Sequence, residues 1–225
     1  MTWGLFAAYA LVATGDWVAV TFTYRASSNS RARKLEYILK PLAMVFLIVA
    51  VSTSASSHGA GYGESDLRRW WIDGGLGLSL VGDVFLMLPN KMFKSGLASF
   101  LAAHVAYIAG LTRGGSGVAR LAIASALLAL VFSPIARKII GRVRQDDGPA
   151  LLAAVSIYMV ALATMAGAGI TSRSSLEAAG GIVFLVSDAT LAWDRFVRPI
   201  HYGRVGVMVT YHVAQGLLAG SLFVH

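Results

Sequence analysis

Five ionisable side chains lie inside long apolar stretches of the sequence: Asp16, Asp83, His104, Asp188 and His212. In the middle of a bilayer each would cost roughly 2.5–3.5 kcal/mol, so it needs a polar partner or a hydrated cavity. Two carboxylates in different surroundings are able to act as acid and base, because burial keeps one protonated while a cation or hydrogen bonds keep the other ionised. These residues are therefore the first candidates for a functional site.

Two short segments place an aspartate at the same register, and each is followed by a histidine. Leu80–Leu86 reads LVGDVFL and Leu185–Leu191 reads LVSDATL, with the aspartate at the fourth position. The apolar stretch after each contains a similar tetrapeptide, His104–Tyr107 (HVAY) and His212–Gln215 (HVAQ). This similarity raises the hypothesis of two four-helix repeats in the same orientation.

The composition indicates what must position these side chains. Of the 225 residues, 56% are hydrophobic and 13% charged, whereas soluble domains carry roughly 25% charged residues. The absence of cysteine excludes Cys-ligated zinc, iron–sulfur clusters and thiol nucleophiles. Eight apolar runs can be read: Trp3–Phe22, Pro41–Ser54, Trp70–Leu88, Ser95–Leu111, Val118–Ala136, Pro149–Ala168, Ala178–Trp193 and Val205–Val224.

These runs predict an all-α fold, a polytopic membrane bundle of eight transmembrane helices in a single domain covering residues 1–225. A span needs about 20 residues, and a lipid core does not tolerate open sheet edges. The second run is short, so we expect Leu35–Lys40 to extend it, with Lys40 at the level of the headgroups. Pro41 is then expected near the start of this helix, where a missing N–H has little effect.

Lys and Arg residues gather in alternate connections between the runs. They are frequent in residues 25–40, 91–94, 137–144 and 195–204, and sparse in the other connections. An excess of Lys and Arg marks the cytoplasmic side, so the sequence predicts an integral multi-pass protein of the cytoplasmic membrane, with both termini away from the cytoplasm. The net charge of +8 then reflects topology and attraction to anionic membrane lipids, and nucleic acid is not expected as a partner.

With this orientation, polar side chains from several helices converge on the cytoplasmic half. Asp83 and Asp188 come shortly before the cytoplasmic ends of their helices, while Lys40, Tyr211 and Gln215 come near the beginnings of theirs. We therefore expect an enclosed polar pocket in that leaflet. A structural interpretation stays open beside the functional one, because a lone buried aspartate or histidine also serves to hold helices together.

Several motifs, taken in order, resemble the YhhN family of integral membrane proteins, the lysoplasmalogenases. Their order and spacing are more specific than any motif alone. One departure is His212, which stands where a second aromatic residue is common. The motifs are Lys40–Leu42, Ser79–Met87, Phe93–Tyr107, Tyr158–Met159, Gly181–Ala192 followed by Arg195–Phe196, and Thr210–Gln215.

This resemblance implies an eight-helix membrane enzyme that hydrolyses the vinyl ether of lysoplasmalogens to a fatty aldehyde and glycerophospho-ethanolamine or glycerophospho-choline. The substrate would be a lysophospholipid taken from among the membrane lipids. The reaction begins when an acid protonates the alkene carbon remote from the ether oxygen, and water then captures the resulting oxocarbenium ion. This chemistry requires neither metal nor cofactor, so neither is expected.

Asp83 and Asp188 are the predicted catalytic residues, one as acid and one as ionised base, and the sequence does not assign which is which. Lys40 is expected to neutralise the ionised member or to meet the lipid phosphate, and Asn90 to contact the headgroup. The remaining predicted substrate-binding residues would line the pocket with hydrogen-bonding groups: His104, Tyr107, Tyr158, Tyr211 and Gln215.

Three other functions remain as alternatives. A proton-coupled transporter also uses buried Asp and His, and a repeat suits alternating access. A lipid-binding membrane protein without turnover is a second alternative. A zinc-dependent lipid hydrolase is a third, although His104 and His212 make no ligand-like spacing with a further ligand.

Overall fold

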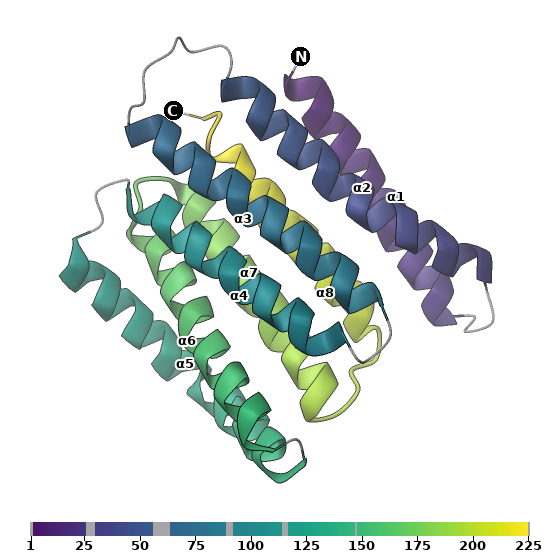
Figure 1. Ribbon diagram of the computed structural model, residues 1–225, viewed down its shortest axis with the longest axis vertical. Helices are drawn as coiled ribbons and strands as arrows, with labels where there is room; N and C mark the ends of the chain where they lie inside the picture. Colours follow the sequence, from purple (N-terminus) through teal and green to yellow (C-terminus); the bar gives the residue numbers. More distant parts are fainter. Residues whose placement is uncertain are drawn as a thin grey trace.

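The computed structural model is a bundle of eight helices (Figure 1). It describes residues 2–25, 30–55, 64–88, 92–113, 117–146 and 148–224, and these ranges contain no strand. The predicted all-α fold is therefore confirmed. The helices are α1 (Thr2–Arg25), α2 (Ser30–Ala55), α3 (Glu64–Met87), α4 (Phe93–Thr112), α5 (Val118–Asp146), α6 (Pro149–Thr171), α7 (Ser175–Phe196) and α8 (Gly203–Gly220).

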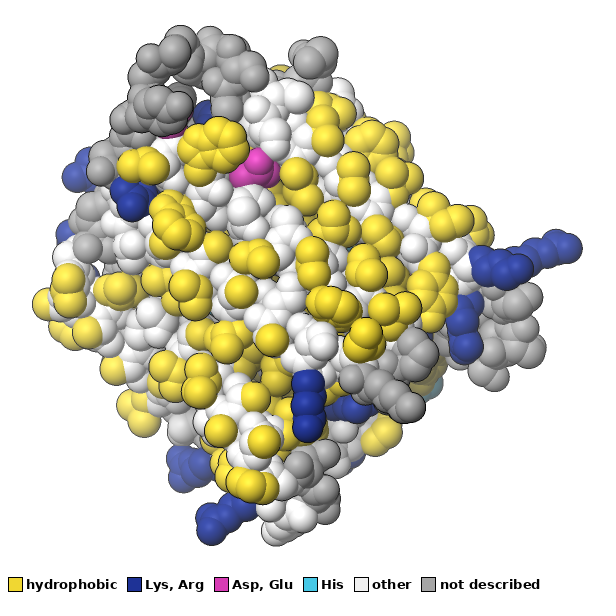
Figure 2. Space-filling view, in the orientation of Figure 1, with side chains coloured by type: hydrophobic (Ala, Val, Ile, Leu, Met, Phe, Trp, Pro, Cys, Tyr) yellow, Lys and Arg dark blue, Asp and Glu magenta, His cyan; other side chains and the backbone are white. Residues whose placement is uncertain are grey.

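Seven of these helices, α1 to α7, are long and apolar enough to cross a membrane. The last helix, α8, has 18 residues and does not meet that criterion within the described residues, although eight spans were expected. Two of its polar side chains, His212 and Gln215, are buried in the bundle. Hydrophobic side chains spread over the visible face of the molecule, while Lys and Arg stand at its margins and lower part (Figure 2). The chain is a polytopic helical membrane protein.

Helices that follow one another in sequence also pack side by side. The closest pairs are α1 with α2, α3 with α4, α5 with α6, and α7 with α8. In Figure 1, α1 and α2 form one flank of the bundle and α5 and α6 form the other, with α3, α4, α7 and α8 between them. The two helix pairs that carry the Asp and His motifs are therefore central.

Close packing of α3 against α4 depends on glycine. A Cβ placed on Gly82 would lie 2.6 Å from the ring of Phe100, which is too close for any real contact. At Gly75, the ring of Tyr107 likewise fills the space that a Cβ would need. Small residues at such positions let membrane helices approach closely, and here they seat two aromatic rings of α4 beside Asp83 and its helix.

Helix α2 begins at Ser30, five residues before the expected Leu35, and Pro41 therefore lies inside the helix rather than near its start. Two charged side chains in the N-terminal part of this helix face the interior. Glu36 and Lys40 are both buried, one helical turn apart, and each forms an ion pair. A search for uncharged runs therefore starts this helix too late.

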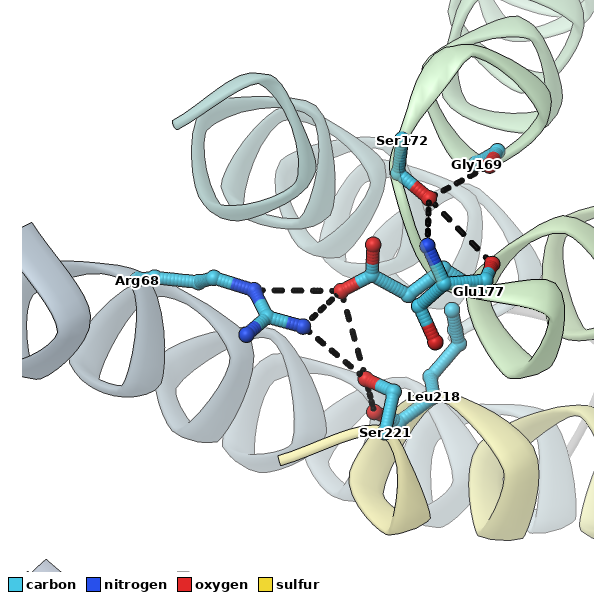
Figure 3. Close-up of polar contacts among 7 residues, drawn as sticks. Arg68, Gly169, Ser172, Glu177, Leu218 and Ser221 are labelled. Atoms are coloured by element: carbon cyan, nitrogen blue, oxygen red, sulfur yellow. Dashed lines mark hydrogen bonds and ion pairs between the residues drawn. The ribbon is translucent and has the colours of Figure 1, made fainter. Parts of the chain in front are cut away.

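The bundle end at which α1 begins holds a buried ion pair between helices (Figure 3). Arg68 of α3 donates from Nε and Nη2 to Oε1 of Glu177 on α7, with the Nε bond at 3.1 Å. The hydroxyl of Ser221, just after α8, lies 3.2 Å from the same oxygen. This contact connects three central helices at the end remote from Asp83 and Asp188.

Candidate active site

A cavity of about 550 Å³ opens at the other end of the bundle, between α2, α3, α7 and α8; we refer to it as the polar cavity. Asp83 and Asp188 both line it, although they belong to different helices. The expected convergence of polar side chains is therefore present in the structure. The other polar or charged lining residues are Arg33, Glu36, Tyr37, Lys40, Tyr158, Ser187, Asp194, Arg195, Arg204 and Tyr211.

Asp83 is an ion-paired carboxylate. Lys40 Nζ of α2 lies 2.9 Å from its Oδ1, and the hydroxyl of Tyr211 on α8 donates to its Oδ2 at 2.6 Å. Only 1% of Asp83 is exposed. A buried charge is tolerated when it is paired and hydrogen-bonded, so both oxygens of this carboxylate are stabilised in the ionised form.

Asp188 has different neighbours. The hydroxyl of Tyr158 on α6 donates to its Oδ2 at 2.5 Å, and His104 Nε2 lies 3.6 Å from the same oxygen. In the described part of the chain, no Lys or Arg forms an ion pair with it. The two aspartates thus occupy matching positions in similar sequences but contrasting electrostatic environments.

His104 lies behind Asp188 and not on the cavity wall. It is fully buried, and its ring packs edge-on against Tyr158 and Phe184, with centroids 5.0 Å apart in both cases. Its Nδ1 lies 2.5 Å from the carbonyl oxygen of Phe100. Contact with substrate, which we expected of His104, is therefore not supported by its place; it contacts Asp188 instead.

Tyr107 and Gln215 also lie inside the bundle, off the described cavity wall. The Tyr107 hydroxyl donates to Gln215 Oε1 at 2.6 Å and lies 3.3 Å from Ser79 Oγ. The two residues close the HVAY and HVAQ tetrapeptides, so equivalent positions of the two similar segments meet between α4 and α8. Their place supports a role in holding these helices together.

A second cavity of about 320 Å³, which we call the apolar cavity, lies between α4, α5, α6 and α7. Its wall consists almost wholly of hydrophobic side chains, among them Leu97, Phe132 and Met159. Asp188 and Tyr158 line both cavities. The carboxyl group of Asp188 therefore stands where a polar chamber adjoins an apolar one.

Five of the predicted site residues meet at the polar cavity, namely Lys40, Asp83, Tyr158, Asp188 and Tyr211. Asn90 lies outside the described residues. The chain also brings together charged residues that the sequence reading assigned only to topology or did not single out.

Glu36, Arg33 and Arg204 line the polar cavity as well, and the Arg204 guanidinium pairs with Glu36 Oε1. The spacing of Glu36 four residues before Lys40 was the available signal, since such residues share one helix face. In the part of the chain that the structure describes, no group of three or more His, Asp or Glu side chains is arranged to hold a metal ion.

Comparisons with known proteins agree with the motif reading. Residues 35–222 match the model of the YhhN family. The chain is similar to lysoplasmalogenase TMEM86B of Sus scrofa, with 34% identity over 82% of this chain and 74% of that protein. It is also similar to lysoplasmalogenase TMEM86B of Homo sapiens, with 31% identity over 67% of this chain and 62% of that protein. Lysoplasmalogenase TMEM86A of Homo sapiens is 29% identical over 73% of this chain and 70% of its own length. No solved structure matches the chain.

Proposed function

Because the chain belongs to the YhhN family, we propose that it hydrolyses the vinyl ether of 1-alkenyl lysophospholipids, releasing a fatty aldehyde and glycerophospho-ethanolamine or glycerophospho-choline. The similar proteins named lysoplasmalogenase support this activity. The observation that carries the proposal is the pair of buried aspartates on one cavity: Asp83 forms an ion pair with Lys40, whereas Asp188 forms none with Lys or Arg in the described residues.

The two adjoining cavities suit a lipid with one chain. The glycerophospho head would occupy the polar cavity, where Arg33, Arg195 and Arg204 offer guanidinium groups to the phosphate. The alkenyl chain would extend into the apolar cavity. The vinyl ether joins head and chain, so it would lie beside Asp188, which lines both cavities.

The surroundings of the two aspartates support distinct roles. Asp188 acts as the acid: its O–H bond breaks, and the π electrons of the alkene form a C–H bond at the alkene carbon remote from the ether oxygen, which leaves an oxocarbenium ion. Asp83, kept ionised by Lys40, stabilises that cation and accepts a proton from the attacking water. The product of this step is a hemiacetal.

Collapse of the hemiacetal returns both groups to their starting states. The proton on Asp83 moves to the ether oxygen, which leaves as the glycerol hydroxyl. The hemiacetal hydroxyl gives its proton to Asp188 as the aldehyde C=O forms. One water is consumed per turnover, and no proton is gained or lost.

We further propose that the polar cavity faces the cytoplasmic leaflet, with both termini on the other side. Figure 1 shows that α1 begins and α8 ends at the same end of the bundle. The residues that line the cavity include the first turns of α2 and the last turn of α3, which lie at the other end. The basic side chains at the cavity belong to the connections that are rich in Lys and Arg.

The test is aldehyde release from a 1-alkenyl lysophospholipid by the purified protein in nanodiscs. We expect turnover by the parent, and loss of about 10²-fold or more in both Asp83→Asn and Asp188→Asn. Asp73→Asn is the matched control: Asp73 also lies on α3 and accepts a hydrogen bond from Ser52 at 2.6 Å, but it does not line the polar cavity.

Three results would contradict the proposal. Full activity of either Asn variant would remove that aspartate from the mechanism. Cleavage of 1-acyl but not 1-alkenyl lipids would show that the wrong bond had been assigned, and substrate uptake into proteoliposomes without aldehyde release would favour the transporter instead.

A further inference from the structure

The two intramembrane histidines occupy equivalent sequence positions but have opposite hydrogen-bonding states. His104 Nδ1 contacts a backbone carbonyl, which only accepts, so Nδ1 carries the proton. His212 Nδ1 instead accepts from Trp17 Nε1–H at 3.0 Å, so a neutral His212 carries its proton on Nε2. The surroundings fix the tautomers independently of the shared motif.

Fixing the proton on Nδ1 leaves His104 Nε2 without a proton when the ring is neutral. This nitrogen is buried, has no hydrogen-bond partner in the described structure, and lies 3.6 Å from Asp188 Oδ2. An unprotonated nitrogen facing an ionised carboxylate would place two lone pairs against each other in a water-poor interior. One proton between them turns this contact into an attraction, whether it belongs to the carboxyl or to the imidazole.

We propose that His104 and Asp188 hold one proton in common, and that His104 is a positioning residue that stores the catalytic proton beside Asp188. This inference rests on the proposed function, since it gives the source of the proton for the alkene carbon. His104 acts through Asp188, because it does not itself line either cavity among the described residues.

The transfer balances over the catalytic cycle. When the proton resides on His104, its Nε2–H bond breaks and an O–H bond forms on Asp188, which leaves a neutral imidazole and a carboxylic acid. That acid protonates the substrate. Hemiacetal collapse gives one proton back to Asp188, and the pair again holds a single proton. No co-reactant other than water is required.

The fixed tautomer explains why histidine suits this position. The Phe100 carbonyl holds the ring so that Nε2 is aimed at Asp188, and Tyr158 and Phe184 confine it from the sides. Tyr158 also donates to the same carboxyl oxygen, which limits rotation of that group. The proton therefore has a short and defined path between two side chains that cannot readily turn away.

The experiment compares His104→Asn with His212→Asn, a matched control that removes an equally buried histidine at the equivalent position. In His104→Asn we expect kcat to fall about 10²-fold with KM within about twofold of the parent, because the cavity wall is unchanged. In His212→Asn we expect kcat and KM close to those of the parent, with any loss confined to thermal stability.

An infrared measurement separates this role from a structural one. The C=O stretching band of a protonated carboxyl that disappears in Asp188→Asn reports the proton on Asp188. We expect His104→Asn to shift this band or alter its intensity, and His212→Asn to leave it unchanged. An unchanged band in His104→Asn would overturn the shared proton, as would loss of activity through KM alone.

Two further controls separate a failure to fold from a failure of the proposed function. If His104→Asn does not fold, His104→Gln gives the same comparison with a longer amide, and thermal unfolding verifies each variant. If the parent releases no aldehyde, the proposed function fails; the infrared comparison still decides whether His104 and Asp188 share a proton.

Discussion

At the scale of single residues, the proposed roles of the two aspartates differ because of what surrounds each of them. Both belong to similar sequence segments and both reach the same cavity. Lys40 forms an ion pair with Asp83, whereas Tyr158 donates a hydrogen bond to Asp188 and His104 lies beside it. The proposed division into acid and base rests on these neighbours.

Removing the cation beside Asp83 should test this division. In Lys40→Gln we expect kcat/KM to fall about 10²-fold, since the oxocarbenium ion and the water lose an ionised partner. Lys40→Arg should recover part of the rate, because it restores the charge. Aldehyde release measures both, and Lys34→Gln, at an exposed position on the same helix, is the control.

Parent-like activity in Lys40→Gln would show that Asp83 does not need this cation. Lys40 is 4% exposed, so its loss also leaves a buried carboxylate without a partner and should lower stability. Thermal unfolding of the same samples separates that effect from the change in rate.

At the scale of helices, the remote end of the bundle is held by a polar contact that the chemistry does not use. Glu177 is 2% exposed and pairs with Arg68 and Ser221, which joins α3, α7 and α8. These helices also carry Asp83, Asp188 and Tyr211. The contact therefore helps to hold the three helices that position these side chains.

Breaking this contact should affect stability more than activity. We expect Glu177→Gln to lower the free energy of unfolding by about 2–3 kcal/mol, less than the 3–5 kcal/mol of a fully buried pair, because the Arg68 side chain is 24% exposed. A double-mutant cycle with Arg68→Gln, measured by unfolding, isolates the pairing energy. Additive losses in the cycle would show that the two side chains do not stabilise each other.

The sequence was sufficient to locate most of the helices. It was not sufficient to decide which face of each helix points to the cavity. Apolar runs located six helices to within several residues, and the position of Lys40, Asp83 and Tyr211 near one end predicted that they converge. The fifth run ended at Ala136, but α5 continues to Asp146, and α2 starts at Ser30 instead of the expected Leu35, because charged residues at these helix ends interrupt the apolar runs.

The sequence also does not show which polar side chains line a cavity and which are buried between helices. His104 and Tyr107 share a helix face, and periodicity alone does not say whether that face meets a cavity or another helix. The ring of Tyr107 turns toward Gln215, and His104 toward Asp188, through contacts that depend on the packing of four helices. Tautomers follow from the same contacts, so they could not be read from the HVAY and HVAQ segments.

At the scale of the whole molecule, the position of the site relative to the membrane decides which leaflet supplies the substrate. The polar cavity lies at the bundle end where α2 and α8 begin, and the proposed orientation places this end in the cytoplasmic leaflet. Labelling of introduced cysteines can test this, because the chain contains no cysteine of its own.

We expect Lys34→Cys, near the start of α2, to resist a membrane-impermeant maleimide in intact cells and to react after permeabilisation. Arg173→Cys, in the connection between α6 and α7 at the other end, should react without permeabilisation. Both positions are exposed, so burial does not account for a difference between them. The reverse pattern would invert the orientation and place the polar cavity in the outer leaflet. The aspartate chemistry would then stand unchanged, but the lysophospholipid would reach it from outside the cell.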